Sequence, residues 1–144
     1  MATAFAGIAD LLSKRAVLIA FPPGTRHPLV PGFLSIVVVH NTHGAMGLLG
    51  DRPVLLIVLA LLVLIALGVL LRDIIRRSVL AQIGFGLVAG GALGNVIDRF
   101  VHGYVIDFIA ARSFYVFNVG DACITVGIVL VALAGGVLSR AGSG

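Results

Sequence analysis

The sequence predicts an all-α membrane protein with four transmembrane helices and a small extracytoplasmic loop that contains β-structure. Of its 144 residues, 60% are hydrophobic and 11% are charged, whereas a soluble domain usually carries about a quarter charged residues. Residues 54–71 (VLLIVLALLVLIALGVLL) form an unbroken apolar run, close to the ~20 residues that span a bilayer. Two further apolar segments follow, so we expect residues 1–144 to form a single integral-membrane domain.

The first predicted helix covers residues 2–21 and is the least apolar of the four, because Asp10, Lys14 and Arg15 interrupt it. A signal peptide would place its positive charge before the apolar region and a small-residue cleavage site after it. Here the charges lie in the middle and the segment ends in FPPGTRHP, so we expect an uncleaved helix. Only nine residues precede Asp10, which makes this helix short at its start.

The next segment, residues 22–53, is too long for a simple connection between helices. Its first part is rich in proline and glycine, and residues 33–39 (FLSIVVV) follow as a run that favours a β-strand. Backbone that is not helical at membrane depth must be covered by protein or line a wet cavity. We therefore expect a small sheet at the membrane surface, with a plain irregular loop as the alternative.

Two more helices are predicted after the 54–71 run. One covers residues 79–97 and is interrupted only by Gln82 and Asn95, and the other covers residues 122–138. Glycines in the first of these favour close helix packing, as small residues do in membranes. These glycines are Gly84, Gly86, Gly90, Gly91 and Gly94.

The basic residues predict the orientation of the chain. The short link between the second and third helices holds three arginines, the densest basic cluster in the sequence. Short loops rich in Lys and Arg stay cytoplasmic, which places Arg140 and the C-terminus inside and residues 22–53 and 98–120 outside. Four arginines also fall outside, so the density of the short link decides this prediction. The net charge of +4 is then explained by the orientation of the chain in the membrane. The sequence has no basic stripe with interleaved aromatic residues, so we expect no nucleic-acid partner.

Cysteine and histidine give no metal-like pattern. Cys123 is the single cysteine, so it can form no intramolecular disulfide and is best explained as a small apolar helix residue. The four histidines lie in the outer segments without ligand spacing. His40 and His43 are close, but no third ligand stands near them. We therefore expect no metal site.

Acidic residues concentrate between residues 90 and 121. The chain has six acidic residues, all Asp, and three of them, Asp98, Asp107 and Asp121, lie in this stretch. A charged group near the bilayer core costs roughly 2.5–3.5 kcal/mol on insertion scales. Such residues therefore indicate either function or a specific pairing.

Asp121 has a structural explanation beside a functional one, and Asp107 does not. The sequence Asn118-Val-Gly-Asp121 opens the last predicted helix and imitates a capping box, and a helix N-terminus favours negative charge. The apolar neighbours of Asp107 in VIDFI should bury it, and a lone buried carboxylate needs a partner. Two close aspartates tend to share one proton. The ionised member can then activate water while the protonated member assists the leaving amine, as peptide hydrolysis requires.

Three blocks in this stretch, GGALGNVIDR, GYVIDFI and FNVGD, resemble the signature blocks of signal peptidase II, the prolipoprotein signal peptidase of bacteria. The close match covers residues 90–124, about a quarter of the chain. Asp10-Leu-Leu-Ser-Lys14 also resembles the Asp…Lys pair of the family's first helix. Residues 41–49 (NTHGAMGLL) resemble its outer-loop block, which is usually close to NTGAAFGLL. Four helices with an outer sheet-bearing loop is also the architecture of that family.

The resemblance implies roles for individual residues. Asp107 and Asp121 match the catalytic dyad of the family. The residues expected to bind substrate or to orient the dyad are Asn41, Asn95, Arg99 and Asn118. Asp10, Lys14 and Asp98 are expected to be structural, with Asp98 in a salt bridge to an arginine or to Lys14.

The chain departs from the family pattern at two positions that bear on the site. Gly120 stands where the family usually has Ala, and His43 stands where the outer-loop block usually has Gly. An ungapped alignment of that block places Asn41 on the asparagine of the family, whereas a gapped one places Thr42 there. Asn offers a donor and an acceptor to a peptide backbone, so we expect Asn41 rather than Thr42 to face the substrate.

The resemblance also implies a substrate and a location. The substrate is a lipoprotein precursor whose lipobox cysteine carries diacylglycerol, and the cut falls just before that cysteine. We expect a multi-pass protein of the bacterial cytoplasmic (inner) membrane, in contact with membrane lipid, whose active site lies near the outer face. No metal or organic cofactor is required, and globomycin-like cyclic peptides are expected to inhibit it.

Two other functions compete with this interpretation. A small polytopic transporter or proton-relay protein also carries intramembrane carboxylates, but it would space them along the membrane depth, whereas these cluster at one edge. A catalytically dead homologue with a binding role is the other alternative. The presence of both Asp107 and Asp121, together with Asn118, argues against it.

Overall fold

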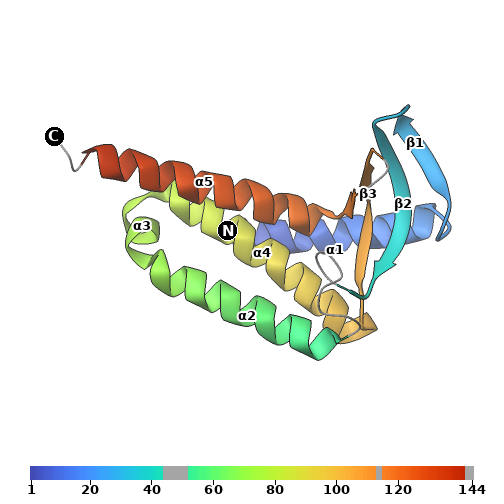
Figure 1. The fold of residues 1–144 in the computed structure, drawn as a ribbon, viewed down its shortest axis with the longest axis horizontal. Helices are drawn as coiled ribbons and strands as arrows, with labels where there is room; N and C mark the ends of the chain where they lie inside the picture. The colour runs from blue at the N-terminus through green and yellow to red at the C-terminus, as the bar shows by residue number, and fades with distance from the viewer. Residues whose placement is uncertain (44–51, 113–114, 142–144) are drawn as a thin grey trace.

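The computed structural model describes residues 1–43, 52–112 and 115–141. A layer of helices lies along the long axis of the molecule, and a small sheet stands across one end of it, opposite the C-terminus (Figure 1). The helices are α1 (Ala2–Ala20), α2 (Pro53–Leu70), α3 (Arg72–Arg77), α4 (Val79–His102) and α5 (Val119–Ala141). The strands are β1 (Arg26–Val30), β2 (Leu34–Asn41), β3 (Val105–Ala111) and β4 (Tyr115–Phe117).

Three helices are long and apolar enough to cross a membrane. They are α2, α4 and the 119–137 part of α5, with mean hydropathies of 3.2, 1.6 and 2.0. The three apolar spans predicted from the sequence are therefore confirmed by length and composition. The first predicted span also forms a helix, α1, but its three charged residues keep it outside this set.

α4 lies between α1 and α5 and packs against both through its glycines. Gly86, Gly90 and Gly94 face α1, while Gly84 and Gly91 face α5. A Cβ added at Gly84 would lie 2.7 Å from the carbonyl oxygen of Gly127, and one at Gly86 would lie 2.8 Å from the Cβ of Ala2. Any side chain there would push the helices apart, so the predicted close-packing role is confirmed.

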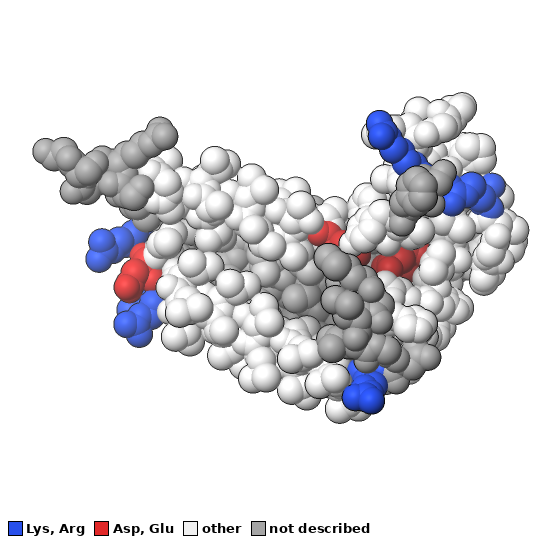
Figure 2. All heavy atoms as spheres, viewed as in Figure 1, with Lys and Arg blue, Asp and Glu red and all other residues white. Residues whose placement is uncertain are grey.

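α2 contrasts with α4 in its surroundings. Ten residues of α4 are buried, whereas no residue of α2 is. Figure 1 shows α2 leaning away from the other helices, with the short α3 joining it to α4. An apolar groove therefore remains between α2 and α5, with α4 as its floor. Figure 2 shows this long helical surface as almost free of charge, with Lys and Arg gathered toward its two ends.

The sheet is antiparallel and joins two distant parts of the chain in the order β1-β2-β3-β4. The β-run predicted at residues 33–39 forms most of β2, so the irregular-loop alternative is wrong there. β1 forms in the proline-rich stretch, where no strand was predicted. Its Pro28 is tolerated because β1 is an edge strand, where a missing N–H breaks no ladder.

β3 and β4 were also missed from the sequence, so the sheet is larger than predicted. β3 is buried on both faces along most of its length, and such a strand lacks the polar alternation that marks a half-exposed one. β2 pairs with β3 in a register that sets Val39 opposite Asp107 and Asn41 opposite Val105. This register places Asn41 near Asp107 although 66 residues separate them.

The C-terminal end of α4 lies farther along the chain than predicted. The helix continues past residue 97 to His102 and ends at Gly103, whose φ of 82° is the left-handed cap that glycine adopts at no steric cost. Asp98 and Arg99 therefore lie inside a helix and not in the outer segment. This extra turn directs Asp98 toward α1 and β3, as its contacts below show.

Candidate active site

Two aspartates from different elements line one cavity of about 230 Å³ beneath the sheet. Asp107 lies in the middle of β3, and Asp121 lies in the first turn of α5. The polar and aromatic lining of the cavity also includes Asn41, Asn95, Arg99 and Tyr115. Acidic atoms are visible in the hollow between the helices and the sheet (Figure 2).

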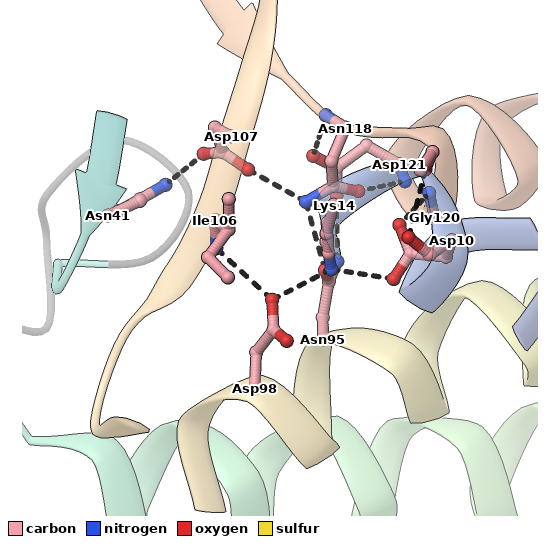
Figure 3. A network of polar contacts seen from close by, with 11 residues as sticks. Asp10, Lys14, Asn41, Asn95, Asp98, Ile106, Asp107, Asn118, Gly120 and Asp121 are labelled. Atoms are coloured by element: carbon pink, nitrogen blue, oxygen red, sulfur yellow. Dashed lines mark hydrogen bonds and ion pairs between the residues drawn. The ribbon is translucent and has the colours of Figure 1, made fainter. Parts of the chain in front are cut away.

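Asp107 is buried, with 3% of its surface exposed, and two asparagine amides hold its carboxylate. Asn41 Nδ2 donates to one oxygen at 2.9 Å, and Asn118 Nδ2 donates to the other at 2.7 Å (Figure 3). The predicted burial of this residue is confirmed. Its partners are neutral amides, which satisfy a buried carboxylate without fixing its charge.

Asp121 is held in the same manner at the start of α5. Asn95 Nδ2 donates to its Oδ1 at 2.9 Å, and the backbone N–H of Asn118 donates to its Oδ2 at 3.2 Å. Asn118 Oδ1 in turn accepts from the backbone N–H of Asp121 at 2.9 Å. These reciprocal bonds form the capping box that the sequence predicted, with Asp in the place of the longer Glu or Gln.

Asn118 thus contacts both aspartates, and it is fully buried (Figure 3). Among the described contacts, no hydrogen bond joins Asp107 to Asp121 directly. Each of their four carboxylate oxygens accepts one N–H. A carboxylate oxygen has two lone pairs, so each keeps acceptor capacity for a proton, a water or a substrate in the cavity.

The surroundings of Asp107 raise its pKa to about 6. Burial is the largest cause, because it disfavours the charged form. Hydrogen bonds from Asn41 and Asn118 oppose the increase, while the negative charge of Asp121 adds to it. Asp107 therefore keeps its proton to a higher pH than an exposed aspartate does.

A second polar cluster lies next to the cavity and is centred on Lys14. Its ammonium contacts Asp10 at 2.6 Å, Asp98 at 2.9 Å and the Oδ1 of Asn95 at 2.9 Å (Figure 3). It donates hydrogen bonds to Asp10 and Asn95 and forms an ion pair with Asp98. The predicted Asp10–Lys14 pair is confirmed, and of the two partners proposed for Asp98 the structure selects Lys14.

The Lys14 cluster also ties α1 to the elements that carry the aspartates. Asp10 Oδ1 accepts from the backbone N–H of Gly120 at 2.7 Å, one residue before Asp121. Asp98 Oδ2 accepts from the backbone N–H of Ile106 at 3.1 Å, one residue before Asp107. A Cβ at Gly120 would lie 2.9 Å from the carbonyl oxygen of Gly91, so glycine fits the close approach of α4 and α5 at this point.

Of the other residues predicted to bind substrate or to orient the dyad, Arg99 and Asn41 lie at the cavity. Arg99 lines the cavity, and its buried Nε has no hydrogen-bond partner within the part of the chain that is described. Asn41 lies at Asp107, whereas the hydroxyl of the half-buried Thr42 bonds to the ring of the exposed His43 at 2.9 Å. Residues 44–49 of the outer-loop block lie outside the described residues.

Two further features of the site concern metal binding and a lining residue that was not predicted. Across residues 1–43, 52–112 and 115–141, no group of three or more His, Cys, Asp or Glu side chains could hold a metal ion. Tyr115 lines the cavity but received no role from the sequence. The one available signal was its alternation with Phe117 just before Asn118, which β4 makes into two stacked rings.

Comparison with known proteins identifies the family of this chain. The sequence model described as signal peptidase (SPase) II matches residues 2–135. The chain belongs to the signal peptidase II family. It is 40% identical over 126 residues to the lipoprotein signal peptidase of Syntrophomonas wolfei, covering 88% of this chain and 84% of that protein. It is 42% identical over 130 residues to that of Trichormus variabilis, covering 87% and 80%.

Solved structures extend the likeness to the fold. A bacterial membrane enzyme determined in meso at 2.3 Å superposes with a TM-score of 0.82 at 29% identity, covering 92% of this chain and 84% of that one. A second, at 1.9 Å, gives a TM-score of 0.80 over 92% and 88%. With three apolar helices long enough to cross a bilayer, this signal peptidase II family member is a multi-pass membrane protein and a protease.

Proposed function

We propose that this protein is an aspartic endopeptidase that removes the signal peptide from bacterial prolipoproteins, with Asp107 and Asp121 as its catalytic dyad. The family and the names of its relatives support the reaction. The observation that carries the aspartic mechanism is that both carboxylates line one cavity and are held by the same residue, Asn118.

The dyad divides the work of hydrolysis between two protonation states. The ionised carboxylate takes a proton from a water molecule as the water oxygen bonds to the carbonyl carbon of the scissile peptide. When the tetrahedral intermediate collapses, the C–N bond breaks and the protonated carboxyl gives its proton to the leaving amine. The raised pKa of Asp107 supports Asp107 as the carboxyl that is protonated at the start, and Asp121 as the carboxylate that takes the proton from water.

The residues around the dyad act through orientation and binding. Asn118 and Asn95 fix the Asp121 carboxylate, and Asn118 and Asn41 fix the Asp107 carboxylate. The Arg99 Nε, buried at the cavity wall without an acceptor among the described residues, is suited to donate to a carbonyl of the substrate backbone. Such preorganised donors are a large source of catalytic power in sites that exclude water.

The signal peptide fits the apolar groove between α2 and α5. A cavity of about 370 Å³ in this groove shares Ala60, Ala92, Arg99 and Ile124 with the cavity of the dyad. A helical signal peptide in the groove would therefore bring its C-terminal end to the two aspartates. The substrate is cut before its lipidated cysteine, and globomycin-like cyclic peptides are expected to compete for the same cavity.

We also propose that α1 is the fourth membrane span of a single domain formed by residues 1–144. Its 19 residues rise about 28 Å, close to the ~30 Å of the hydrocarbon core. Two of its three charged residues, Asp10 and Lys14, are buried inside the protein, so lipid does not meet them. The arginine-rich α3 is placed on the cytoplasmic side, which puts the sheet and the dyad at the outer face of the inner membrane.

Cleavage of a lipidated precursor by the purified protein tests this function. We expect the wild type to convert a diacylglyceryl-modified prolipoprotein to a faster-migrating product on a gel, with the modified cysteine at its new N-terminus. Asp107→Asn, purified in parallel, should leave the precursor intact. A wild type that leaves the precursor uncut, or an Asp107→Asn protein that cuts it equally well, would contradict the proposal, and the first result would favour the transporter or proton-relay alternative.

A further inference from the structure

A second groove reaches Asp121 from the other side of α5. It encloses a cavity of about 340 Å³ between α5 and β4. Besides Asp121, its described lining consists of Tyr115, Phe117, Ala122, Thr125 and Val126. This groove is separate from the one between α2 and α5, which uses Ile124 and Ile128 on the other side of the helix.

The second groove meets the cavity of the dyad at Asp121 and Tyr115. Both residues line the cavity of the dyad and the second groove. The Tyr115 ring stacks on Phe117 with centroids 6.0 Å apart and an interplanar angle of 25°, so two aromatic rings cover the outer end of the second groove. An occupant of this groove would therefore end beside one member of the dyad.

The chemistry of the groove suits a hydrocarbon. Of its two hydroxyls, the one on Thr125 already donates to the backbone oxygen of Asp121 at 2.9 Å, and the other is the phenol of Tyr115 at the end near the dyad. Val126 is 51% exposed and Val129, on the same face of α5, is 52% exposed. In a membrane-spanning helix this face meets lipid, so the groove opens sideways into the bilayer.

We propose that this groove holds an acyl chain of the diacylglycerol on the substrate cysteine. The inference rests on the proposed function, because that substrate brings two apolar parts to one reaction centre. The signal peptide precedes the scissile bond and the lipidated cysteine follows it. A peptide helix needs the long groove between α2 and α5, which leaves the short groove on the opposite side of Asp121 for the lipid.

The groove contributes to catalysis by positioning the substrate and not by a gain in hydrophobic free energy. Lipid tails are as apolar as leucine, so an acyl chain gains no transfer free energy on leaving the bilayer for the protein. A chain seated between Tyr115 and Val126 instead holds the adjacent cysteine, and with it the scissile bond, over Asp121. A displacement of about 1 Å from the reactive geometry can cost on the order of 10²-fold in rate.

A matched pair of substitutions tests this placement. Val126→Phe fills the groove, whereas Val129→Phe adds the same ring on the same face of α5 one turn farther from Asp121, at nearly equal exposure. With a dipalmitoylglyceryl peptide as substrate, we expect Val126→Phe to lower kcat/KM at least about tenfold and Val129→Phe to leave it within about twofold. Equal activities of the two variants would overturn the inference.

Photocrosslinking supplies a readout that does not depend on turnover. The inactive Asp107→Asn protein is mixed with the same peptide carrying a diazirine in one acyl chain, and the labelled segment is identified by mass spectrometry. We expect the label in α5 around Ala122–Val126 and none in α2. A label only in α2, or one that excess phospholipid removes, would overturn the inference while leaving the cleavage of lipidated precursors by the wild type intact.

Discussion

Four aspartates of this protein, three of them buried and Asp121 half-buried, form two pairs with opposite surroundings. Asp10 and Asp98 both form ion pairs with the Lys14 ammonium. Asp107 and Asp121 are held by asparagine amides and backbone N–H, and both line a cavity. Asn95 stands between the pairs, accepting from Lys14 and donating to Asp121.

The difference between the pairs teaches how one residue type serves two purposes in one small protein. A neighbouring cation attracts the ionised carboxylate directly. A neutral amide satisfies the carboxylate as an acceptor and brings no opposite charge to it, and a cavity gives water and substrate access to it. The Lys14 pair therefore links α1 to α4 and α5, and the pair held by Asn118 is the one proposed for catalysis.

The largest effect is expected from neutralising either member of the amide-held pair. Asp107→Asn and Asp121→Asn should each lower cleavage by about 10³-fold or more, because a general acid or base is lost from a site that needs both. Both proteins should accumulate and melt like the wild type. The exposed Asp73→Asn on α3 is the control, and appreciable turnover by either dyad variant would remove that residue from the catalytic pair.

The next effect is expected from removing the cation of the other pair. Lys14→Met leaves two buried carboxylates without their ammonium, which typically costs about 3–5 kcal/mol. We expect the folded amount in membranes and the Tm in detergent to fall sharply. Arg15→Met, at the exposed neighbouring position, should change neither, and equal behaviour of the two variants would show that the cluster contributes little to folding.

A smaller loss of stability is expected from Asp98→Asn. The amide keeps an oxygen that can accept from Lys14 and from the Ile106 N–H, so only the charge is lost, at about 1–3 kcal/mol. The folded fraction should cleave substrate within about threefold of the wild-type rate. A fully folded but inactive Asp98→Asn protein would place Asp98 in the catalytic set and erase the distinction between the pairs.

Asn41, which lines the cavity, and its chain neighbour Thr42 allow a comparison between two adjacent side chains. Asn41→Ala removes a donor to Asp107, whereas Thr42→Ala removes a hydroxyl that bonds to His43. We expect Asn41→Ala to lower kcat/KM by roughly tenfold, the effect of one hydrogen bond to a charged group, and Thr42→Ala to change it little. Equal losses, or a greater loss at Thr42, would show that the ungapped alignment of the outer-loop block is wrong.

The smallest effect is a shift in the pH dependence of cleavage. The pKa of Asp107 is raised to about 6, so it holds its proton below this pH, and activity that needs a protonated carboxyl should decline as pH rises through this region. The hydrogen bond from Asn41 lowers this pKa. Its loss in Asn41→Ala should therefore move the alkaline limb to higher pH by less than about one unit, and a shift to lower pH would contradict this assignment.

The long helices and the burial of Asp107 could be predicted from the sequence because both leave local signals. An apolar run such as residues 54–71 is long enough to span a bilayer in any context, and a carboxylate amid apolar neighbours, as at Asp107, indicates a purpose wherever it occurs. The glycines of α4 were also identified correctly, since close packing needs only their spacing. β3 was missed because its partner β2 lies far along the chain and because a strand buried on both faces carries no alternating pattern. β1 was missed because it contains a proline, and β4 because it has only three residues.

What only the tertiary structure decided is which partner each aspartate receives. The sequence allowed Asp98 to pair with an arginine or with Lys14, and the choice depends on how α1 packs against the glycine face of α4. The sequence also placed Asn41 and Asp107 in separate segments, and their contact depends on the register of β2 against β3. Residue types are fixed locally, but a carboxylate takes its protonation and its role from neighbours that the folded chain brings within about 3 Å.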